Sequence, residues 1–172
     1  MRSKKPRLVE SEEALYDYAV RSLGRRMRTV AELKRLMRLR VPEASGADWI
    51  EAVVARLKDQ KYLNDTQYAA MFARARQENQ RFGKRRVQQD LMVKGVHPEI
   101  ITKTLDTSYG ELDEEELARQ YIARKRIPKP QDDKQSARVV RRLLRAGYST
   151  GVIFRVLKKW DMELLDLEQQ PD

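Results

Sequence analysis

Residues 84–105 read KRRVQQDLMVKGVHPEIITKTL, and residues 136–157 read SARVVRRLLRAGYSTGVIFRVL. In each segment the apolar residues follow the spacing of two amphipathic helices, with a glycine turn between them. Each segment therefore predicts a helix, a tight turn and a second helix, and their similarity predicts that this unit recurs in the chain. A shift of 52 residues superposes Arg86, Val87, Leu91, Gly95, Ile101 and Leu105 on Arg138, Val139, Leu143, Gly147, Ile153 and Leu157.

The sequence around these segments extends the pattern to nine helices in three groups. Thr29 with Glu32 forms a capping box at the start of the second helix, and Asp113 with Glu116 forms another at the start of the seventh. We therefore predict an all-α fold, an elongated, solenoid-like tandem array of three three-helix repeats. The predicted parts are a basic N-terminal extension (1–11), repeat 1 (12–62), repeat 2 (63–108), repeat 3 (111–161) and an acidic C-terminal tail (162–172).

Two prolines mark the connection that we expect to be most extended. Pro128 and Pro130 stop a helix, and the residue before each proline favours an extended backbone. We predict a hinge between repeats 2 and 3 at residues 127–130.

The composition excludes several classes of catalytic and metal site. The chain of 172 residues has no cysteine and one histidine, which excludes a thiolate zinc site and a disulfide framework. A Ser/His/Asp unit would need His97, but this residue stands directly before Pro98, where we expect a helix cap or a solvated side chain. No glycine-rich phosphate-binding loop of either known form occurs.

The acidic run at residues 113–116 is the one segment that suggests a metal site. Four consecutive helical residues point in different directions, and carboxylates in the first turn are already favoured by the helix dipole. We predict capping rather than metal binding here. For the whole chain we expect no enzyme activity, no catalytic residue, no metal and no cofactor.

The chain has no segment that predicts membrane insertion. No run approaches the roughly 18 apolar residues that a membrane span needs, and the basic N-terminus is not followed by an apolar signal core. We expect a cytoplasmic monomer with no membrane partner.

The charge is strongly basic and unevenly distributed. Thirty-six Lys and Arg residues face 26 Asp and Glu residues, a formal charge of +10. Residues 161–172 carry five acidic and no basic residues, so the first 160 residues carry +15. A basic excess spread over a protein body indicates a polyanion or an acidic surface as partner. The acidic tail could shield a basic face or contact a partner, and simple fraying is the alternative.

Basic residues gather at corresponding places in each predicted repeat, on the outer face of the middle helix and near the end of the first helix. Arginine dominates these clusters, and its planar guanidinium suits phosphate or carboxylate. The alternative is that each cluster is an ordinary solvated face. We predict that the clusters form the binding surface: Arg25, Arg26, Arg28, Lys34, Arg35, Arg38, Arg74, Arg76, Lys84, Arg85, Arg86, Lys94, Arg124, Lys125, Arg126, Arg138, Arg141, Arg142 and Arg145.

The glycine turns also fit the spacing of a helix-turn-helix motif. A helix that reads bases needs donors near its N-terminus, and the helix after Gly95 offers only Lys103 as a basic residue. We favour helix packing as the explanation, and keep the ninth helix, with Arg155, Lys158 and Lys159, as the alternative reader of bases.

Three aromatic residues could stack on nucleic-acid bases. Tyr68, Phe72 and Phe154 stand at the spacing of helical core positions. We therefore predict that they pack in the core, with base stacking as the alternative.

The middle of the chain carries a recognisable order of motifs. Residues 62–69 read YLNDTQYA, and Arg74-Ala75-Arg76, Phe82-Gly83 and LMVKGV at 91–96 follow. This order resembles the central signature of the bacterial regulatory protein RecX family, over a stretch that covers residues 12–160. The first repeat departs from it, with Val41-Pro42 where the others have a glycine turn.

The resemblance implies a function as well as a fold. It implies three tandem three-helix repeats that bind the RecA filament on single-stranded DNA along its groove. It also implies that such a protein restrains RecA's recombinase, ATPase and coprotease activities, and so affects DNA recombination, repair and the SOS response. The basic residues named above would then contact RecA. Direct contacts from these residues to DNA phosphates are a possible addition. The alternative is a stand-alone, sequence-nonspecific nucleic-acid-binding repeat protein.

Overall fold

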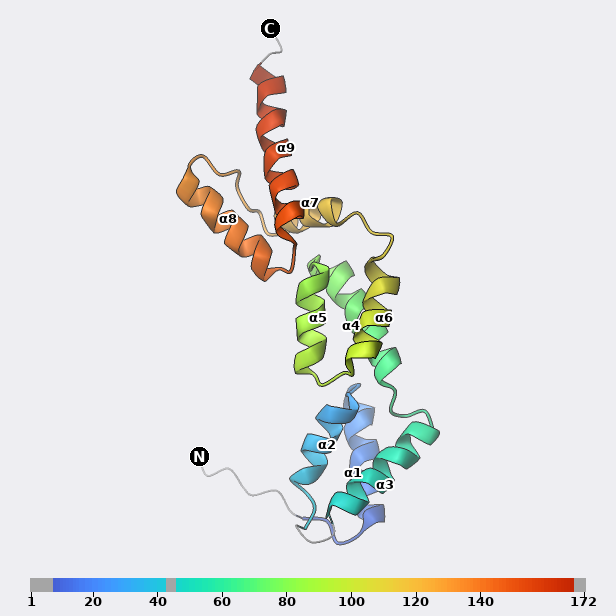
Figure 1. Ribbon diagram of the computed structural model, residues 1–172. Coiled ribbons are helices and arrows are strands. Elements are labelled where there is room, and N and C mark those ends of the chain that lie inside the picture. The colour runs from blue at the N-terminus through green and yellow to red at the C-terminus, as the bar shows by residue number, and fades with distance from the viewer. Residues whose placement is uncertain (1–7, 43–45, 169–172) are drawn as a thin grey trace, which may run out of the picture. The chain divides into compact units, whose positions relative to one another are not determined.

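The computed structural model describes residues 8–42 and 46–168, with side chains described up to Trp160. The described residues form helices joined by short connections, with no strand among them (Figure 1). The predicted all-α class and the grouping in threes are confirmed. The helices are α1 (Glu12–Arg25), α2 (Val30–Arg38), α3 (Gly46–Asp59), α4 (Asp65–Gln80), α5 (Lys84–Val93), α6 (Pro98–Tyr109), α7 (Glu114–Arg124), α8 (Asp133–Arg145) and α9 (Thr150–Glu168).

The helices belong to two compact units. The first consists of residues 1–69 and 91–101, and the second of residues 70–90 and 102–172. The boundary between the units therefore passes through the second three-helix group, so that α4, α5 and α6 each contribute to both units.

In the first unit, α1, α2 and α3 enclose one apolar core (Figure 1). Leu15, Leu33, Met37 and Leu57 are fully buried there, each from the apolar stripe of its helix. Burial stabilises each such side chain by about 1.5–3 kcal/mol. The capping box predicted for α2 is present, between Thr29 and Glu32, and Ser11 caps α1.

The turn after α5 packs against the start of α2 within the first unit. Gly95 has φ +74°, and a Cβ atom there would lie 2.4 Å from the Cβ of Ala31, so both the backbone conformation and the close approach require glycine. The Thr29 hydroxyl donates to the carbonyl oxygen of Lys94 at 2.7 Å. The backbone amide of Val30 donates to the carboxylate of Asp65 at 2.9 Å. The first amides and side chains of α2 are thus satisfied by residues of the next repeat.

The second unit repeats this junction with the turn after α8 and the start of α5. Gly147 has φ +95°, and a Cβ atom there would lie 2.3 Å from the backbone nitrogen of Arg86. The amide of Gly83 donates to the carbonyl oxygen of Ala146 at 2.9 Å. Gly95 and Gly147, which the 52-residue shift superposes, therefore have the same role: each lets a turn pack closely against the start of a middle helix.

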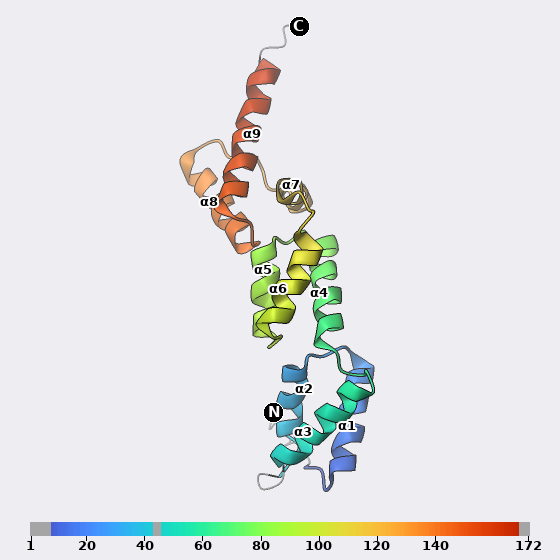
Figure 2. The same ribbon diagram turned by 45° about the vertical axis from the view of Figure 1, so that its right-hand side comes forward.

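Tyrosines complete the interior of the second unit, in which α7, α8 and α9 pack as the third group (Figure 2). Tyr148 is fully buried, and its hydroxyl lies against the carbonyl oxygens of Arg81 and Leu117. The Tyr109 hydroxyl donates to the carbonyl oxygen of Phe82 at 2.9 Å. Burial raises the pKa of both phenols far above the usual value, so both remain neutral donors.

Two sequence expectations differ from the structure. The predicted hinge between repeats 2 and 3 is wrong, because residues 127–130 connect α7 to α8 inside the third group. Ile127 is buried there, and the Lys129 ammonium contacts the carbonyl oxygen of Trp160. Helix α9 continues to Glu168, so it includes much of the segment expected to be a separate acidic tail.

Candidate functional site

Helix α8 presents the densest group of unpaired cations in the described part of the chain. Its apolar side buries Val139 and Leu143, and the side chain of Asp132 caps its N-terminus by accepting from the amide of Gln135 at 2.7 Å. We call the four exposed arginines on the outer side the α8 stripe, and none has an ion pair among the described residues. They span about 10 Å along the helix axis. The α8 stripe consists of Arg138, Arg141, Arg142 and Arg145.

The middle helix of the first group carries a smaller free surface. Arg35 and Arg38 are exposed and have no ion pair with any described residue. Lys34 is half-buried, and its ammonium lies 2.6 Å from the carboxylate of Glu51 on α3. Two of the three predicted cations of α2 are therefore available to a partner.

The cations of α5 are mostly engaged inside the protein. Lys84 pairs with Asp106 at 2.8 Å. Arg86 and Arg76 share the carboxylate of Asp90, at 3.1 and 3.6 Å. Only Arg85 is exposed without an ion pair among the described residues. On α5, therefore, two of the three predicted cations pair with carboxylates, Asp90 of α5 itself and Asp106 of α6, and the sequence alone does not show the pairing with α6.

Lys94 holds the junction between the first two groups. Its ammonium lies 2.7 Å from the carboxylate of Glu32, and both side chains are partly buried. Burial alone would raise the pKa of Glu32, but the hydrogen bonds from Lys94 and from the Thr29 amide outweigh it and leave the pKa lowered. The hydrogen bond to Glu32 raises the pKa of Lys94. We therefore assign Lys94 a structural role in the junction.

The basic clusters near the end of each group's first helix also divide into cations that have a partner and cations without an ion pair. Arg28 donates to the carbonyl oxygen of Ser22 at 3.4 Å, and Arg74 pairs with Glu78 within α4. Arg76 also lies over the ring of Phe72, 4.8 Å from its centroid. The exposed cations that have no ion pair among the described residues are Arg25, Arg26, Arg124, Lys125 and Arg126.

One cation cluster, between α7 and α9, is not among the predicted sites. The carboxylate of Glu115 contacts Arg119 and lies 2.6 Å from Lys159 and 3.4 Å from Arg155. Hydrogen bonds from Lys159 and then Arg119 lower the pKa of Glu115 to about 2. Only the i, i+4 spacing of Glu115 and Arg119 signals this cluster in the sequence, because the other cations come from a distant helix.

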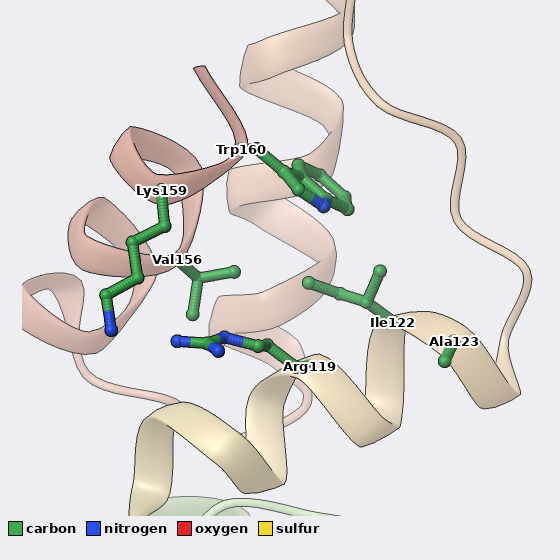
Figure 3. A pocket seen from close by; sticks show the side chains of 6 residues that line it. All are labelled: Arg119, Ile122, Ala123, Val156, Lys159 and Trp160. Carbon is green, nitrogen blue, oxygen red and sulfur yellow. The ribbon is translucent and has the colours of Figure 1, made fainter. Parts of the chain in front are cut away.

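A cavity of about 300 Å³ adjoins this cluster (Figure 3). Arg119 and Lys159 lie on one side of it, and Ile122, Val156 and Trp160 supply apolar walls. Because both cations already share Glu115, their charge is partly neutralised before any ligand arrives.

The residues considered for catalysis and for metal binding lie at the starts of helices. His97 is exposed, and its carbonyl oxygen accepts from the amide of Ile101 at the start of α6. Asp113 caps α7 by accepting from the amides of Glu115 and Glu116. Among the residues whose side chains are described, 8–42 and 46–160, no group of three or more His, Cys, Asp or Glu is placed to hold a metal ion. None of the helices described is both long enough and apolar enough to cross a membrane.

The aromatic residues do not all behave as predicted. Tyr68 is buried, as expected, and Phe72 is half-buried beneath Arg76. The prediction that Phe154 packs in the core is wrong, because 65% of this residue is exposed. The core side of α9 is already filled by Val152, Ile153 and Val156, which leaves Phe154 on the opposite side.

Known proteins are similar to this chain in both sequence and fold. A family model described as the second three-helix domain of RecX matches residues 64–105. A protein named regulatory protein RecX from Trichlorobacter lovleyi is 33% identical over 147 residues, which cover 84% of this chain and 94% of that protein. One of the same name from Oceanobacillus iheyensis is 27% identical over 159 residues, and the match spans 90% of this chain but only 57% of that relative. A crystal structure of regulatory protein RecX, with 22% identity, superposes with a TM-score of 0.72 over 86% of this chain and 71% of the other.

Proposed function

The chain belongs to the RecX family of regulatory proteins, and from that premise we propose that it binds the RecA filament on single-stranded DNA and restrains RecA activity. The activities concerned are strand exchange, ATP hydrolysis and the coprotease function that triggers the SOS response. The protein acts by binding, without catalysing a reaction of its own.

The observation that supports this proposal is the distribution of unpaired cations. Each of the three helix groups presents exposed arginines without an ion pair among the described residues, with Arg35 and Arg38 on α2, Arg85 on α5 and the α8 stripe. A filament repeats its acidic surfaces and DNA phosphates along its length. Several weak contacts on one chain add up when they engage such a repeated partner, because every contact after the first is intramolecular.

The α8 stripe makes the strongest contribution in this proposal. Its four guanidinium groups need not break an ion pair with another described residue before they bind a phosphate or carboxylate. Arginine also offers two parallel donors to either group. By contrast, Lys84 and Arg86 would lose Asp106 and Asp90 on binding a new anion.

A test compares RecA-dependent ATP hydrolysis and strand exchange on single-stranded DNA with and without substoichiometric amounts of the folded protein. We expect both rates to fall. Replacing the four arginines of the α8 stripe by glutamine should raise the protein concentration needed for half-maximal inhibition at least about tenfold. An unchanged rate in both assays with the wild-type protein would contradict the proposal.

The control variant removes the same amount of charge elsewhere and should keep the wild-type inhibition. It carries four exposed basic residues outside the predicted set and outside α8, replaced by glutamine: Arg21, Lys58, Lys61 and Lys103. Equal losses in the two variants would show that net charge, rather than the α8 stripe, sets the affinity.

A second candidate function is direct nucleic-acid binding without RecA. It is favoured by the α8 stripe, because a row of free guanidinium groups suits a phosphate backbone without sequence preference. Firm binding to DNA alone, lost steeply with added salt, would support it, whereas weak binding to DNA and firm binding to the filament would support the first proposal.

A further inference from the structure

The exposed side of α9 combines an aromatic ring with positive charge. Phe154 and Lys158 stand four residues apart, so they occupy one face of the helix, on the side away from Ile153 and Val156. Lys158 is exposed and has no ion pair among the described residues. No acidic residue occurs in α9 from Thr150 to Trp160.

Packing does not explain why this face has a phenylalanine. An exposed aromatic side chain gains little from folding, because most of its apolar surface stays in water. Among the described residues, Phe154 has no aromatic or cation–π contact. Its ring is therefore available to a partner.

Gly151 lies one turn before Phe154 in α9. Glycine weakens a helix relative to alanine. A Cβ atom at this position would meet only the guanidinium of Arg155, at an ordinary 3.6 Å. Internal packing therefore has no need of glycine here, and the residue one turn before the ring has no side chain.

Cations flank the ring on both sides of the turn. Residues 146–149 join the end of α8 to the start of α9, so Arg145 and Phe154 belong to the same end of this helix pair. Arg155 reaches Glu115 at 3.4 Å, yet 61% of its side chain remains exposed. Anions near Phe154 would therefore meet positive groups from two helices.

We propose that the start of α9 binds single-stranded nucleic acid, with one unstacked base on the Phe154 ring and neighbouring phosphates at Lys158, Arg155 and the end of the α8 stripe. The ring selects unpaired strands, because the bases of a duplex are already stacked on one another. Positive charge around the ring favours a polyanion over an apolar protein surface. This inference rests on the second candidate function, direct nucleic-acid binding, and it names the site and the kind of strand bound there.

The test measures the affinity of the full chain for fluorescent 20-mers by anisotropy, in the absence of RecA. The probes are oligo-dT, an abasic strand with the same number of phosphates, and oligo-rU. Phe154→Ala should weaken oligo-dT binding at least about fivefold, the change expected from losing one stacked base. It should leave the abasic strand unaffected, and Phe154→Trp should bind oligo-dT like the wild type. The rU probe reports whether RNA serves equally well.

Met92→Ala is the matched control, because it truncates another exposed apolar side chain, on α5, and should bind like the wild type. Circular dichroism establishes that each variant is folded. The proposal is overturned if Phe154→Ala binds oligo-dT like the wild type, or loses dT and abasic binding equally. It is also overturned if the wild type fails to bind oligo-dT. Since no arm of the assay contains RecA, failure of this proposal is distinct from failure of the RecA proposal.

Discussion

At the scale of single residues, Gly147 is the position where one added carbon does most damage. Its φ of +95° disfavours any side chain, and a Cβ atom would come within 2.7 Å of the backbone of both Arg86 and Gly83. We expect Gly147→Ala to lower the free energy of unfolding by about 2–4 kcal/mol. Gly24→Ala should be neutral or stabilising, because nothing lies within 4 Å of its Cβ position in α1. Urea unfolding of both variants measures the difference, and equal stabilities would refute this account of the junction.

The carboxylate of Glu115 should make stability depend on pH. Its pKa in the folded protein is lowered to about 2 from the usual 4.5, so the stability that it contributes is fully present above pH 4.5. That contribution is lost as the pH falls toward 2. Glu115→Gln should have a lower Tm than the wild type at pH 6, and the gap should close as the pH falls through this range. Glu111→Gln, which removes an exposed carboxylate without a described partner, should keep the wild-type dependence.

At the scale of the helix, the start of α2 depends on a hydroxyl that serves two repeats. The Thr29 hydroxyl accepts from the amide of Glu32 at 3.0 Å and donates to the carbonyl oxygen of Lys94 at 2.7 Å. Thr29→Ala should cost about 2–4 kcal/mol, because it removes the cap and leaves the Lys94 carbonyl without this donor. Ser11→Ala removes only the exposed cap of α1 and should cost about 1 kcal/mol. Thr29→Ser should keep most of the wild-type stability, because it keeps the hydroxyl. A Thr29→Ala variant no less stable than Ser11→Ala would argue against a stabilising role for the hydrogen bond to Lys94.

Helix starts and turns were predictable because their signals are local. The cap at Thr29 and the turn at Gly95 depend on residues within a few positions of each other. The state of each cation was not predictable in this way. Asp106 reaches Lys84 from 22 positions away, and Lys159 reaches Glu115 from 44 positions away, so helix packing decides which cations remain free. Phe154 was misplaced because helical spacing alone does not tell which side of an amphipathic helix is already full.

At the scale of the whole molecule, the charge divides into a basic body and an acidic end. Residues 163–172 hold four acidic and no basic residues, so deleting them raises the formal charge from +10 to +14. We expect the truncated protein to bind single-stranded DNA more tightly at low salt, with the difference vanishing at high salt as the charges are screened. Filter binding at about 20 mM and about 300 mM salt measures this difference. A control with the four acids replaced by their amides, at full length, should behave like the deletion; unchanged affinity at low salt would argue against shielding.

The residue before each middle helix differs in what it bonds to. Thr29 and Gly83 both bond to the turn of a following repeat, and Asp132 caps the start of α8 with its own side chain. In the first two groups the start of the middle helix therefore also serves as a connector between repeats, so a protein designer who joins such repeats must choose this residue together with the turn that it meets.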